Sequence, residues 1–303
     1  MSPTIFVVAA TGTLGKALAL ELRKIGWGVH ATVRDPSSPA AVELASSGVK
    51  LFPGNWDNEN VLKEALAGCD GLFLNLMPSF TDWDADVRQG RNIVSIAKAA
   101  GVKHAIYSAG ADYLAEGIGP DSLVAKFLGN KKLIEAAVRD AGFETYTILR
   151  PSSFMANWLA PKVSMYRGLT ETGTFTTALR PDTVMVSVDE YDVAAFSIAA
   201  FKDPLRFSGQ AIPVASQKHT IEELFASISH ALGRPLKLKY LSDEEASALA
   251  PEDPFIEAQI MTRVMSDHYN MEDVRSWGIP LHTFEEFLER EKASLKETYS
   301  RLT

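Results

Sequence analysis

The sequence has very little cysteine: Cys69 is the only one among 303 residues. A single cysteine excludes an intramolecular disulfide and a metal site built from several thiolates, and it favours a reducing compartment. No apolar run reaches the roughly 18 residues that a membrane-spanning helix needs. The chain opens Met-Ser-Pro-Thr, without the basic segment of a secretory signal, and has no Asn-x-Ser/Thr acceptor. We therefore expect a cytoplasmic protein with no membrane partner.

Positive charge is also in short supply, since 30 lysines and arginines face 38 aspartates and glutamates. The net charge of -8 and the pI near 5.4 argue against a protein that binds nucleic acid by neutralising phosphates. The composition, 46% apolar and 22% charged, is typical of a folded globular chain with a large core. The length allows one large α/β domain or two smaller domains, and the oligomeric state stays open.

Two common kinds of catalytic motif are missing. The six histidines show no His-x-x-x-His or comparable spacing, so we expect no metal site. No Gly-x-Ser-x-Gly elbow of a serine hydrolase occurs either.

What the sequence does contain is a regular alternation of short apolar runs with amphipathic helical segments over its first half. This alternation is typical of βαβ units on a parallel sheet, and right-handed crossovers then give a doubly wound Rossmann sheet. The expected strands are 4–10, 28–34, 49–54, 71–76, 102–108 and 145–150, and the clearest expected helices are 14–25 and 88–100.

After Pro151 the pattern becomes irregular, with loops and short elements. We expect one more helix at 189–201 and one more strand at 210–215 to rejoin the Rossmann domain. Thr220 is expected to cap a helix, and 284–299 reads as one amphipathic helix. The predicted division is a Rossmann domain of 1–155 and 183–218, and a smaller, mostly helical substrate-binding region of 156–182 and 219–303.

A glycine-containing turn follows the first expected strand and opens the first expected helix. In this context Gly12 would let the backbone approach a pyrophosphate at the helix N-terminus, and Gly15 would let the helix pack closely on the sheet. Ala9 occupies the place where a first glycine is usual. The alternative is a tight turn that needs glycines for steric reasons alone.

Arg34 ends the second expected strand and Asp35 follows it, at the place where the residue that selects the ribose is found in dinucleotide-binding folds. An arginine there can hold the additional phosphate of NADP, which favours NADP(H) as the cofactor. Asp35 leaves NAD open, because its carboxylate could bind a free 2′-hydroxyl. A solvated surface arginine is the structural alternative.

The ordered set of motifs resembles the NmrA-like family of atypical short-chain dehydrogenases over nearly the whole chain. The motifs are Ala10-Thr11-Gly12-Thr13-Leu14-Gly15, Thr32-Val33-Arg34-Asp35-Pro36, Gly54-Asn55-Trp56-Asp57, Tyr107-Ser108-Ala109-Gly110, Lys131-Lys132-Leu133-Ile134-Glu135 and the run 146–157. The resemblance implies a Rossmann domain with a C-terminal substrate region, and NADP rather than NAD. It also implies one of two functions, a reductase or a non-catalytic regulator that senses NADP(H).

By this resemblance Lys131 matches the lysine that lies beside the nicotinamide ribose in the reductase branches. Lys132 could be mistaken for it in register, and a surface lysine paired with Glu135 is the structural alternative. The Tyr-x-x-x-Lys pair of short-chain dehydrogenases is missing, because Gly117 stands four places after Tyr113. The proton donor is therefore open among Tyr113, Lys131 and a substrate hydroxyl, and Ser108 is a candidate by position alone.

Topology and resemblance together give the expected cofactor-binding and substrate-binding residues. Those for the cofactor are Thr11, Gly12, Thr13, Leu14, Gly15, Arg34, Asn55, Trp56, Leu76, Met77, Lys131, Pro151 and Phe154. Met155, Trp158 and Tyr166 belong to an aromatic and methionine-rich cluster that suits a planar apolar substrate or simply covers the end of the sheet. The leading hypothesis is an NADPH-dependent reductase that transfers hydride to a carbonyl, quinone or conjugated double bond of an aromatic or polyketide-like small molecule.

Overall fold

The computed structural model describes residues 2–79 and 81–302, and within them the chain forms two compact units. The first unit comprises residues 2–112, 127–151 and 193–212, and the second comprises 113–126, 152–192 and 213–302. This grouping differs from the expected division at 113–126, 152–155, 183–192 and 213–218, which belong to the second unit. The binding roles expected for the two regions stay predictions.

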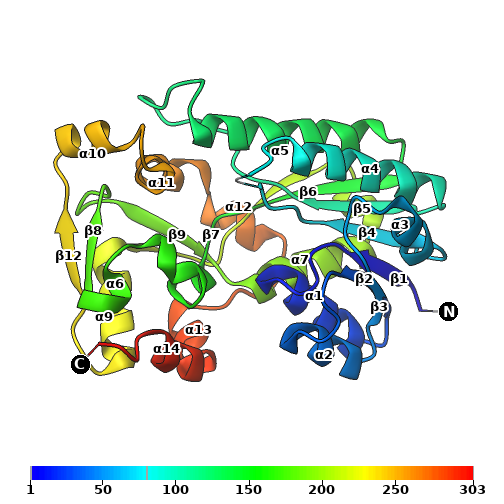
Figure 1. Ribbon diagram of the computed structural model, residues 1–303, viewed down its shortest axis with the longest axis horizontal. Coiled ribbons are helices and arrows are strands. Elements are labelled where there is room, and N and C mark those ends of the chain that lie inside the picture. Colours follow the sequence, from blue (N-terminus) through cyan, green and yellow to red (C-terminus); the bar gives the residue numbers. More distant parts are fainter. Residues whose placement is uncertain (1, 80, 303) are drawn as a thin grey trace. The chain divides into compact units, whose positions relative to one another are not determined.

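The first unit is built on a seven-stranded sheet with the order β10-β6-β5-β4-β1-β2-β3 (Figure 1). Its strands are β1 (Thr4–Val7), β2 (Gly28–Val33), β3 (Lys50–Pro53), β4 (Gly71–Leu74), β5 (His104–Ser108), β6 (Thr145–Pro151) and β10 (Ala211–Val214). The pairings of β1 with β2 and β4, of β2 with β3, and of β5 with β4 and β6 are parallel. The order reverses beside β1, so a crevice at the carboxyl ends of β1 and β4 is expected there.

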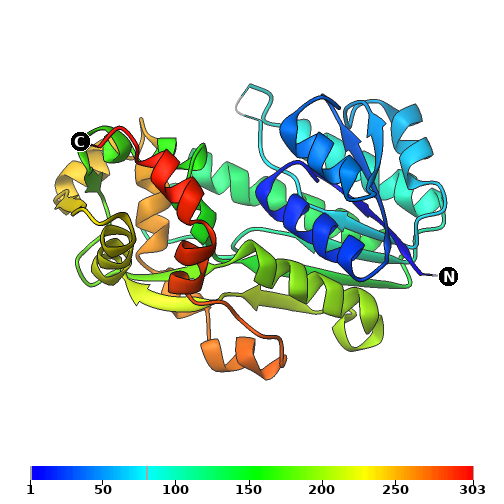
Figure 2. The ribbon, with the colours of Figure 1, turned by 90° about the horizontal axis from the view of Figure 1, so that it is seen from below.

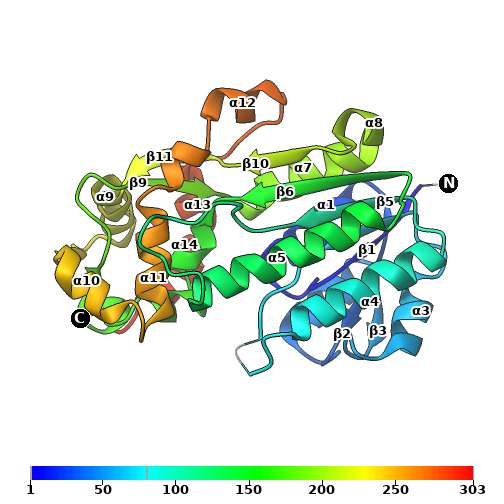
Figure 3. The ribbon, with the colours of Figure 1, turned by 90° about the horizontal axis from the view of Figure 1, so that it is seen from above.

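Helices cover both faces of this sheet. They are α1 (Thr13–Lys24), α2 (Pro39–Ser46), α3 (Glu59–Leu66), α4 (Ala85–Ala99), α5 (Leu123–Asp140), α7 (Glu190–Lys202) and the short α8 (Pro204–Phe207). In Figures 1 and 3, α3, α4 and α5 lie on one face, whereas α1, α2 and α7 lie on the other. Figure 2 shows α1 in blue and α7 in yellow-green against that second face. The doubly wound Rossmann fold expected from the sequence is therefore confirmed.

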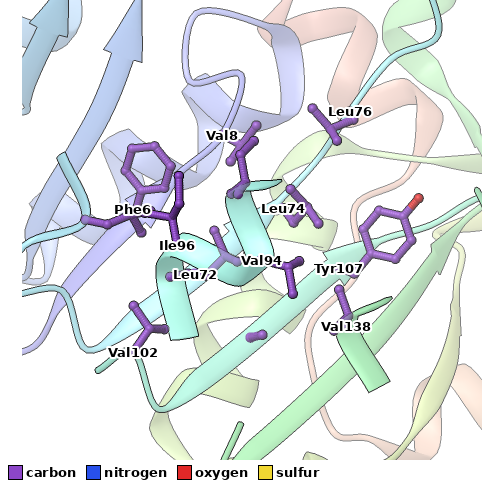
Figure 4. Packing of buried hydrophobic residues seen from close by; sticks show 14 of the residues in the cluster. Phe6, Val8, Leu72, Leu74, Leu76, Val94, Ile96, Val102, Tyr107 and Val138 are labelled. Carbon is purple, nitrogen blue, oxygen red and sulfur yellow. The ribbon is translucent and has the colours of Figure 1, made fainter. Parts of the chain in front are cut away.

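Apolar side chains of the strands pack against α4 and α5 to form the core of the first unit (Figure 4). Phe6, Leu72 and Leu74 are fully buried, as expected for strands that are covered on both faces. Leu76 continues this buried layer two residues beyond β4. The core thus extends to the carboxyl ends of the strands, the edge at which open α/β sheets bind ligands.

The second unit contains two small sheets and several short helices. The strands are β7 (Ser153–Phe154), β9 (Val184–Val188) and β11 (Gln217–Thr220) in one sheet, and β8 (Thr174–Thr177) and β12 (Lys237–Tyr240) in the other. The α-helices are α6 (Leu169–Thr172), α9 (Ile221–Leu232), α10 (Asp243–Leu249), α11 (Pro254–Thr262), α12 (Met271–Ser276), α13 (Phe284–Arg290) and α14 (Lys292–Thr298). Three 3-10 turns complete it, η1 (Met155–Trp158), η2 (Lys162–Met165) and η3 (Met265–His268).

Most of the expected elements are present, with small shifts of their ends. All six strands of the first half are found, and Thr220 caps α9 in a capping box with Glu223. The single helix expected at 284–299 is wrong, because the chain leaves helical geometry at Glu291 and forms α13 and α14. No helix in the described part of the chain is long and apolar enough to cross a bilayer.

Candidate nucleotide site

The turn between β1 and α1 brings the strand and the helix into close contact. A Cβ atom on Gly15 would lie 2.3 Å from the carbonyl oxygen of Ala9, so only glycine fits there. This confirms the packing role expected for Gly15. Ala9 adopts a φ of 56°, a left-handed conformation that favours glycine. The place where a first glycine is usual is therefore occupied by an alanine that keeps the conformation of a glycine.

The N-terminus of α1 offers backbone donors to an anion. Gly12 is the N-cap, no side chain caps the helix, and its first turn has no acidic residue. The N–H groups of Thr13, Leu14 and Gly15 have no acceptor within the helix, because they belong to its first turn. The N–H of Gly12 donates to Ala9 at 2.9 Å. A helix N-terminus of this kind favours an anion, and the binding of a pyrophosphate by Gly12, Thr13, Leu14 and Gly15 stays a prediction.

Arg34 and Asp35 have clearly different surroundings. Arg34 is exposed, and the described residues give its guanidinium neither a hydrogen bond nor an ion pair. The Asp35 carboxylate accepts from the N–H and the hydroxyl of Ser37, at 2.9 and 2.6 Å. These bonds from Ser37 hold the pKa of Asp35 below its usual value. Both bonds end on Oδ1, so Oδ2 of Asp35 stays accessible, and the two residues differ instead in that Arg34 lines a cavity of the first unit whereas Asp35 does not.

A cavity of about 770 Å³ lies in the first unit beside these residues. Six of the expected cofactor-binding residues line it, namely Thr11, Gly12, Arg34, Asn55, Trp56 and Met77. The volume is within the range of small-molecule and cofactor sites. The wall is partly rigid, because the Trp56 indole N–H donates to the Thr32 hydroxyl at 3.0 Å and the Asn55 side chain accepts from the N–H of Asp57 and Asn58. A helix N-terminus and an available arginine fit the phosphates of a dinucleotide.

One wall of the cavity was missed from the sequence. Arg88 and Gln89 on α4 line it together with Asp57 and Asp82. Arg88 pairs with Asp82 at 3.0 Å and with Asp57 at 3.7 Å, and Gln89 donates to Asp57 at 2.9 Å. The signal that could have identified them is their position at the start of the helix that follows β4, at the carboxyl edge of the sheet.

The other expected cofactor-binding residues do not line this cavity. They are Thr13, Leu14, Gly15, Leu76, Lys131, Pro151 and Phe154. Lys131 and Leu76 are nevertheless brought together, because the Lys131 ammonium donates to the Leu76 carbonyl at 2.5 Å. Pro151 ends β6, and Phe154 lies in β7 of the second unit beneath the ammonium of Lys162.

Lys131 is buried on α5, with 5% of its surface exposed. Burial lowers its pKa to about 8, and the charge of Asp86 opposes this shift. The surface pairing of Lys131 with Glu135 is wrong, because Glu135 pairs instead with Arg139 and Arg150. A buried lysine that titrates near neutral pH is typical of functional sites.

The two further catalytic candidates lie in different units. Ser108 is buried at the end of β5, and a side chain at Gly110 would contact the stem of Lys131. Ser108 and Lys131 thus belong to the same edge of the first unit. Tyr113 lies in the second unit, stacked on His268 with 3.6 Å between ring centroids. Their catalytic roles stay predictions, as does the identity of the proton donor.

The expected substrate residues form part of the core of the second unit. Met155 and Trp158 are buried, and the Trp158 ring stacks on Tyr166 at 4.4 Å between centroids. Burial raises the pKa of Tyr166 above its usual value. Core packing accounts for Met155 and Trp158, so of the three only the partly buried Tyr166 has surface with which to contact a ligand.

Comparisons with known proteins agree with this geometry. The NmrA-like family matches residues 1–302. An NAD(P)H azoreductase of Xenophilus azovorans is 32% identical over 246 residues, which cover 80% of this chain and 78% of that protein.

Two solved structures share the fold. A triphenylmethane reductase of Citrobacter sp. complexed with NADP(H) has a TM-score of 0.70 at 22% identity, covering 94% of this chain and 99% of that one. NmrA, a negative transcriptional regulator in complex with NADP, has a TM-score of 0.69 at 21% identity, covering 100% and 92%. With the family matched from end to end and its fold present, this chain belongs to the NmrA-like family.

Proposed function

We propose that this protein is an NADPH-dependent reductase that transfers hydride to a small aromatic or polyketide-like molecule. The reducible group is a carbonyl, a quinone or a conjugated double bond. The observation that carries the proposal is the cavity in which an available Arg34 and the N-terminus of α1 meet the carboxyl edge of the sheet. The similarity to an NAD(P)H azoreductase supports a redox reaction and adds azo compounds to the acceptors worth testing.

The residues of this chain divide the binding work. The N–H groups of Thr13, Leu14 and Gly15 bind the pyrophosphate, because the positive end of the helix favours an anion. Arg34 binds the 2′-phosphate through charge-assisted hydrogen bonds, since Arg34 lines the cavity and Asp35 does not. The nicotinamide, when bound, supplies the hydride.

Lys131 supplies positive charge at the other end of the site. Its ammonium is fixed on the Leu76 carbonyl, at the end of the segment that continues β4. A charge held there orients the nucleotide and stabilises negative charge that develops on the acceptor. Because burial brings its pKa to about 8, Lys131 can also exchange a proton near neutral pH.

The test is oxidation of NADPH by the purified protein in the presence of azo dyes, quinones, enones and aryl ketones. We expect turnover of at least one class, and we expect Lys131→Met to reduce kcat strongly while the affinity for NADPH changes little. Lys132→Met is the matched control, because Lys132 is the exposed neighbour on the same helix. Turnover that is equal in both variants would remove Lys131 from the reaction.

The alternative is a regulator that binds NADP(H) without chemistry. Two observations favour it: the Tyr-x-x-x-Lys pair is absent at Tyr113, and the fold is similar to that of NmrA. Tight NADPH binding without turnover of any of the four acceptor classes would support this alternative.

A further inference from the structure

A buried carboxylate lies in the same part of the first unit as Lys131. Asp86, in the first turn of α4, is 1% exposed. Its Oδ1 accepts from the side-chain amide of Asn130 at 2.9 Å and from the N–H of Val87 at 3.0 Å. Its Oδ2 is buried and receives no hydrogen bond from the described residues. A buried carboxylate oxygen without a donor is costly unless a positive charge lies nearby.

Asn130 links this carboxylate to Lys131. It is the residue before Lys131 on α5, and its amide also donates to the carbonyl of Trp83 at 2.6 Å. Asn130 is itself buried, so its orientation is set by these two acceptors. The bond from Asn130 to Asp86 thereby joins α5 to α4, next to Lys131 in the sequence of α5.

Among the described residues, the surroundings of Lys131 supply no other unmatched negative charge. Its ammonium lies 5.7 Å from the ring centre of Tyr107 and 5.5 Å from that of Phe127. Tyr107, whose ring and hydroxyl are seen in Figure 4, is neutral because burial raises its pKa. Glu135, one turn further along α5, is matched by Arg139 and Arg150.

We propose that Asp86 is a positioning residue that serves as the internal counter-ion of Lys131. The negative charge of this carboxylate favours the charged form of the ammonium, and Asn130 fixes the carboxylate. The inference rests on the proposed function, in which Lys131 acts beside the nucleotide. It also predicts that Asp86 raises the pKa of Lys131 in the protein without nucleotide or substrate.

The first test follows the titration of Lys131 by NMR of side-chain nitrogens in the protein without nucleotide. Asp86→Asn keeps the acceptor for Asn130 and removes the charge, so the midpoint for Lys131 should fall by about one pH unit or more. Asp84→Asn is the matched control, because Asp84 is an exposed acid two residues earlier. An unchanged midpoint in Asp86→Asn, or an equal shift in both variants, would overturn the proposal.

A second measurement needs no substitution at Asp86 and covers the case in which Asp86→Asn does not fold. In the unsubstituted protein, the carboxyl carbon of Asp86 should report the deprotonation of Lys131 as a shift with the same midpoint. In Lys131→Met this shift should disappear. A carboxyl signal that is insensitive to Lys131 would show that the two groups are not coupled.

The last test separates this inference from the proposed reaction. In an active enzyme, the alkaline fall of kcat should move to lower pH in Asp86→Asn and return to its original position in Asp86→Glu. In the Lys131→Met background, Asp86→Asn should have no further effect on kcat. If the NMR midpoint moves but no acceptor is reduced, the counter-ion role stands and the reductase proposal fails. If Lys131-dependent turnover is found with an unmoved midpoint, the reverse is true.

Discussion

At the scale of single residues, we expect Arg34 to determine which nucleotide the cavity prefers. Arg34→Ala should weaken NADPH binding by about 1.5 to 3 kcal/mol, because a charge-assisted contact to the 2′-phosphate is lost. NADH binding should change little, since NADH has no such phosphate. Binding of both nucleotides can be measured by calorimetry, with Arg91→Ala as the control, because Arg91 is exposed on α4 and does not line the cavity. Equal losses for NADPH and NADH would exclude this role of Arg34.

Ala9 carries a local strain that can also be measured. An alanine in the left-handed region destabilises the folded state by about 1 to 2 kcal/mol. Ala9→Gly removes this strain, but it also makes the unfolded chain more flexible, so only part of the energy is recovered as stability. Ala9→Gly should therefore raise the free energy of unfolding by about 0.5 to 1 kcal/mol in urea titrations. Ala45→Gly, at an exposed position within α2, should lower it by about 1 kcal/mol. If Ala9→Gly lowered the free energy of unfolding as much as Ala45→Gly does, Ala9 would not be strained.

The sequence predicted those residues whose role depends on near neighbours. The packing role of Gly15 and the place of Arg34 beside the cavity could be predicted because a strand, a turn and a helix follow one another within one βαβ unit. The partner of Lys131 was not found, because Leu76 lies 55 positions away in the chain. Asp86 shows no local signal at all, since its burial depends on how α4 packs against α5.

At the scale of elements, α13 is held at both ends by a buried acidic segment at the start of α7. Before the helix, the His282 ring bonds to Asp192 at 2.5 Å. At its end, Arg290 pairs with Asp189 at 2.7 Å and approaches Glu190 at 3.5 Å. Three carboxylates thus face one arginine and one histidine, so the net charge of this cluster depends on the protonation of the histidine and the carboxylates.

The pKa values of His282, before α13, and of Glu190, near its end, are both raised. Burial of His282 disfavours its charge, but the bond and the charge of Asp192 outweigh it and raise the pKa of His282 above 6.5. Burial and the charge of Asp189 raise the pKa of Glu190 to about 7. Burial also raises the pKa of Asp192, and the bonds from Ser216 and His282 offset only part of this.

The folded protein therefore holds protons at His282 and Glu190 more tightly than the unfolded chain does. The stabilisation from His282 is complete below pH 6.5 and is lost as the pH rises through its raised pKa, while that from Glu190 is lost between about pH 4.5 and 7. These two groups should therefore lower Tm as the pH rises from 5 to 8.5, whereas His219, whose pKa burial lowers to about 4, should raise Tm up to about pH 6.5.

Scanning calorimetry over this range checks the expectation. His282→Gln should flatten the upper part of the curve and Glu190→Gln the lower part. His230→Gln, at an exposed position on α9, should leave the curve unchanged. A Tm that rises with pH in the unsubstituted protein would show that these two groups do not dominate.

The sequence predicted the strands of the seven-stranded sheet better than those of the second unit. The six buried strands were visible as apolar runs, because both faces of a parallel sheet are covered. The break at Glu291 was not visible, since the amphipathic pattern of 284–299 continues across it. The strands β7, β8 and β9 pair with segments that are remote in the chain, and no regular alternation with helical segments marks them.

At the scale of the whole molecule, two separate hydrophobic cores support the two units. All residues that line the nucleotide cavity belong to the first unit. A ligand that binds only the folded state stabilises it by about 2.7 kcal/mol at a concentration of 100 times Kd. NADPH should therefore act first on the stability of the first unit.

Hydrogen exchange of backbone amides can resolve this effect along the chain. With NADPH at 100 times its measured Kd, exchange should slow about 100-fold in β1, α1 and β4, as the stabilisation of the first unit implies. Exchange in α9 and α13, which form the core of the second unit, should slow much less. Arg34→Ala at the same NADPH concentration should lose most of the protection, because its Kd is higher. Equal slowing in both cores would mean that the chain opens as one cooperative unit, and the assignment of nucleotide stabilisation to the first unit alone would be wrong.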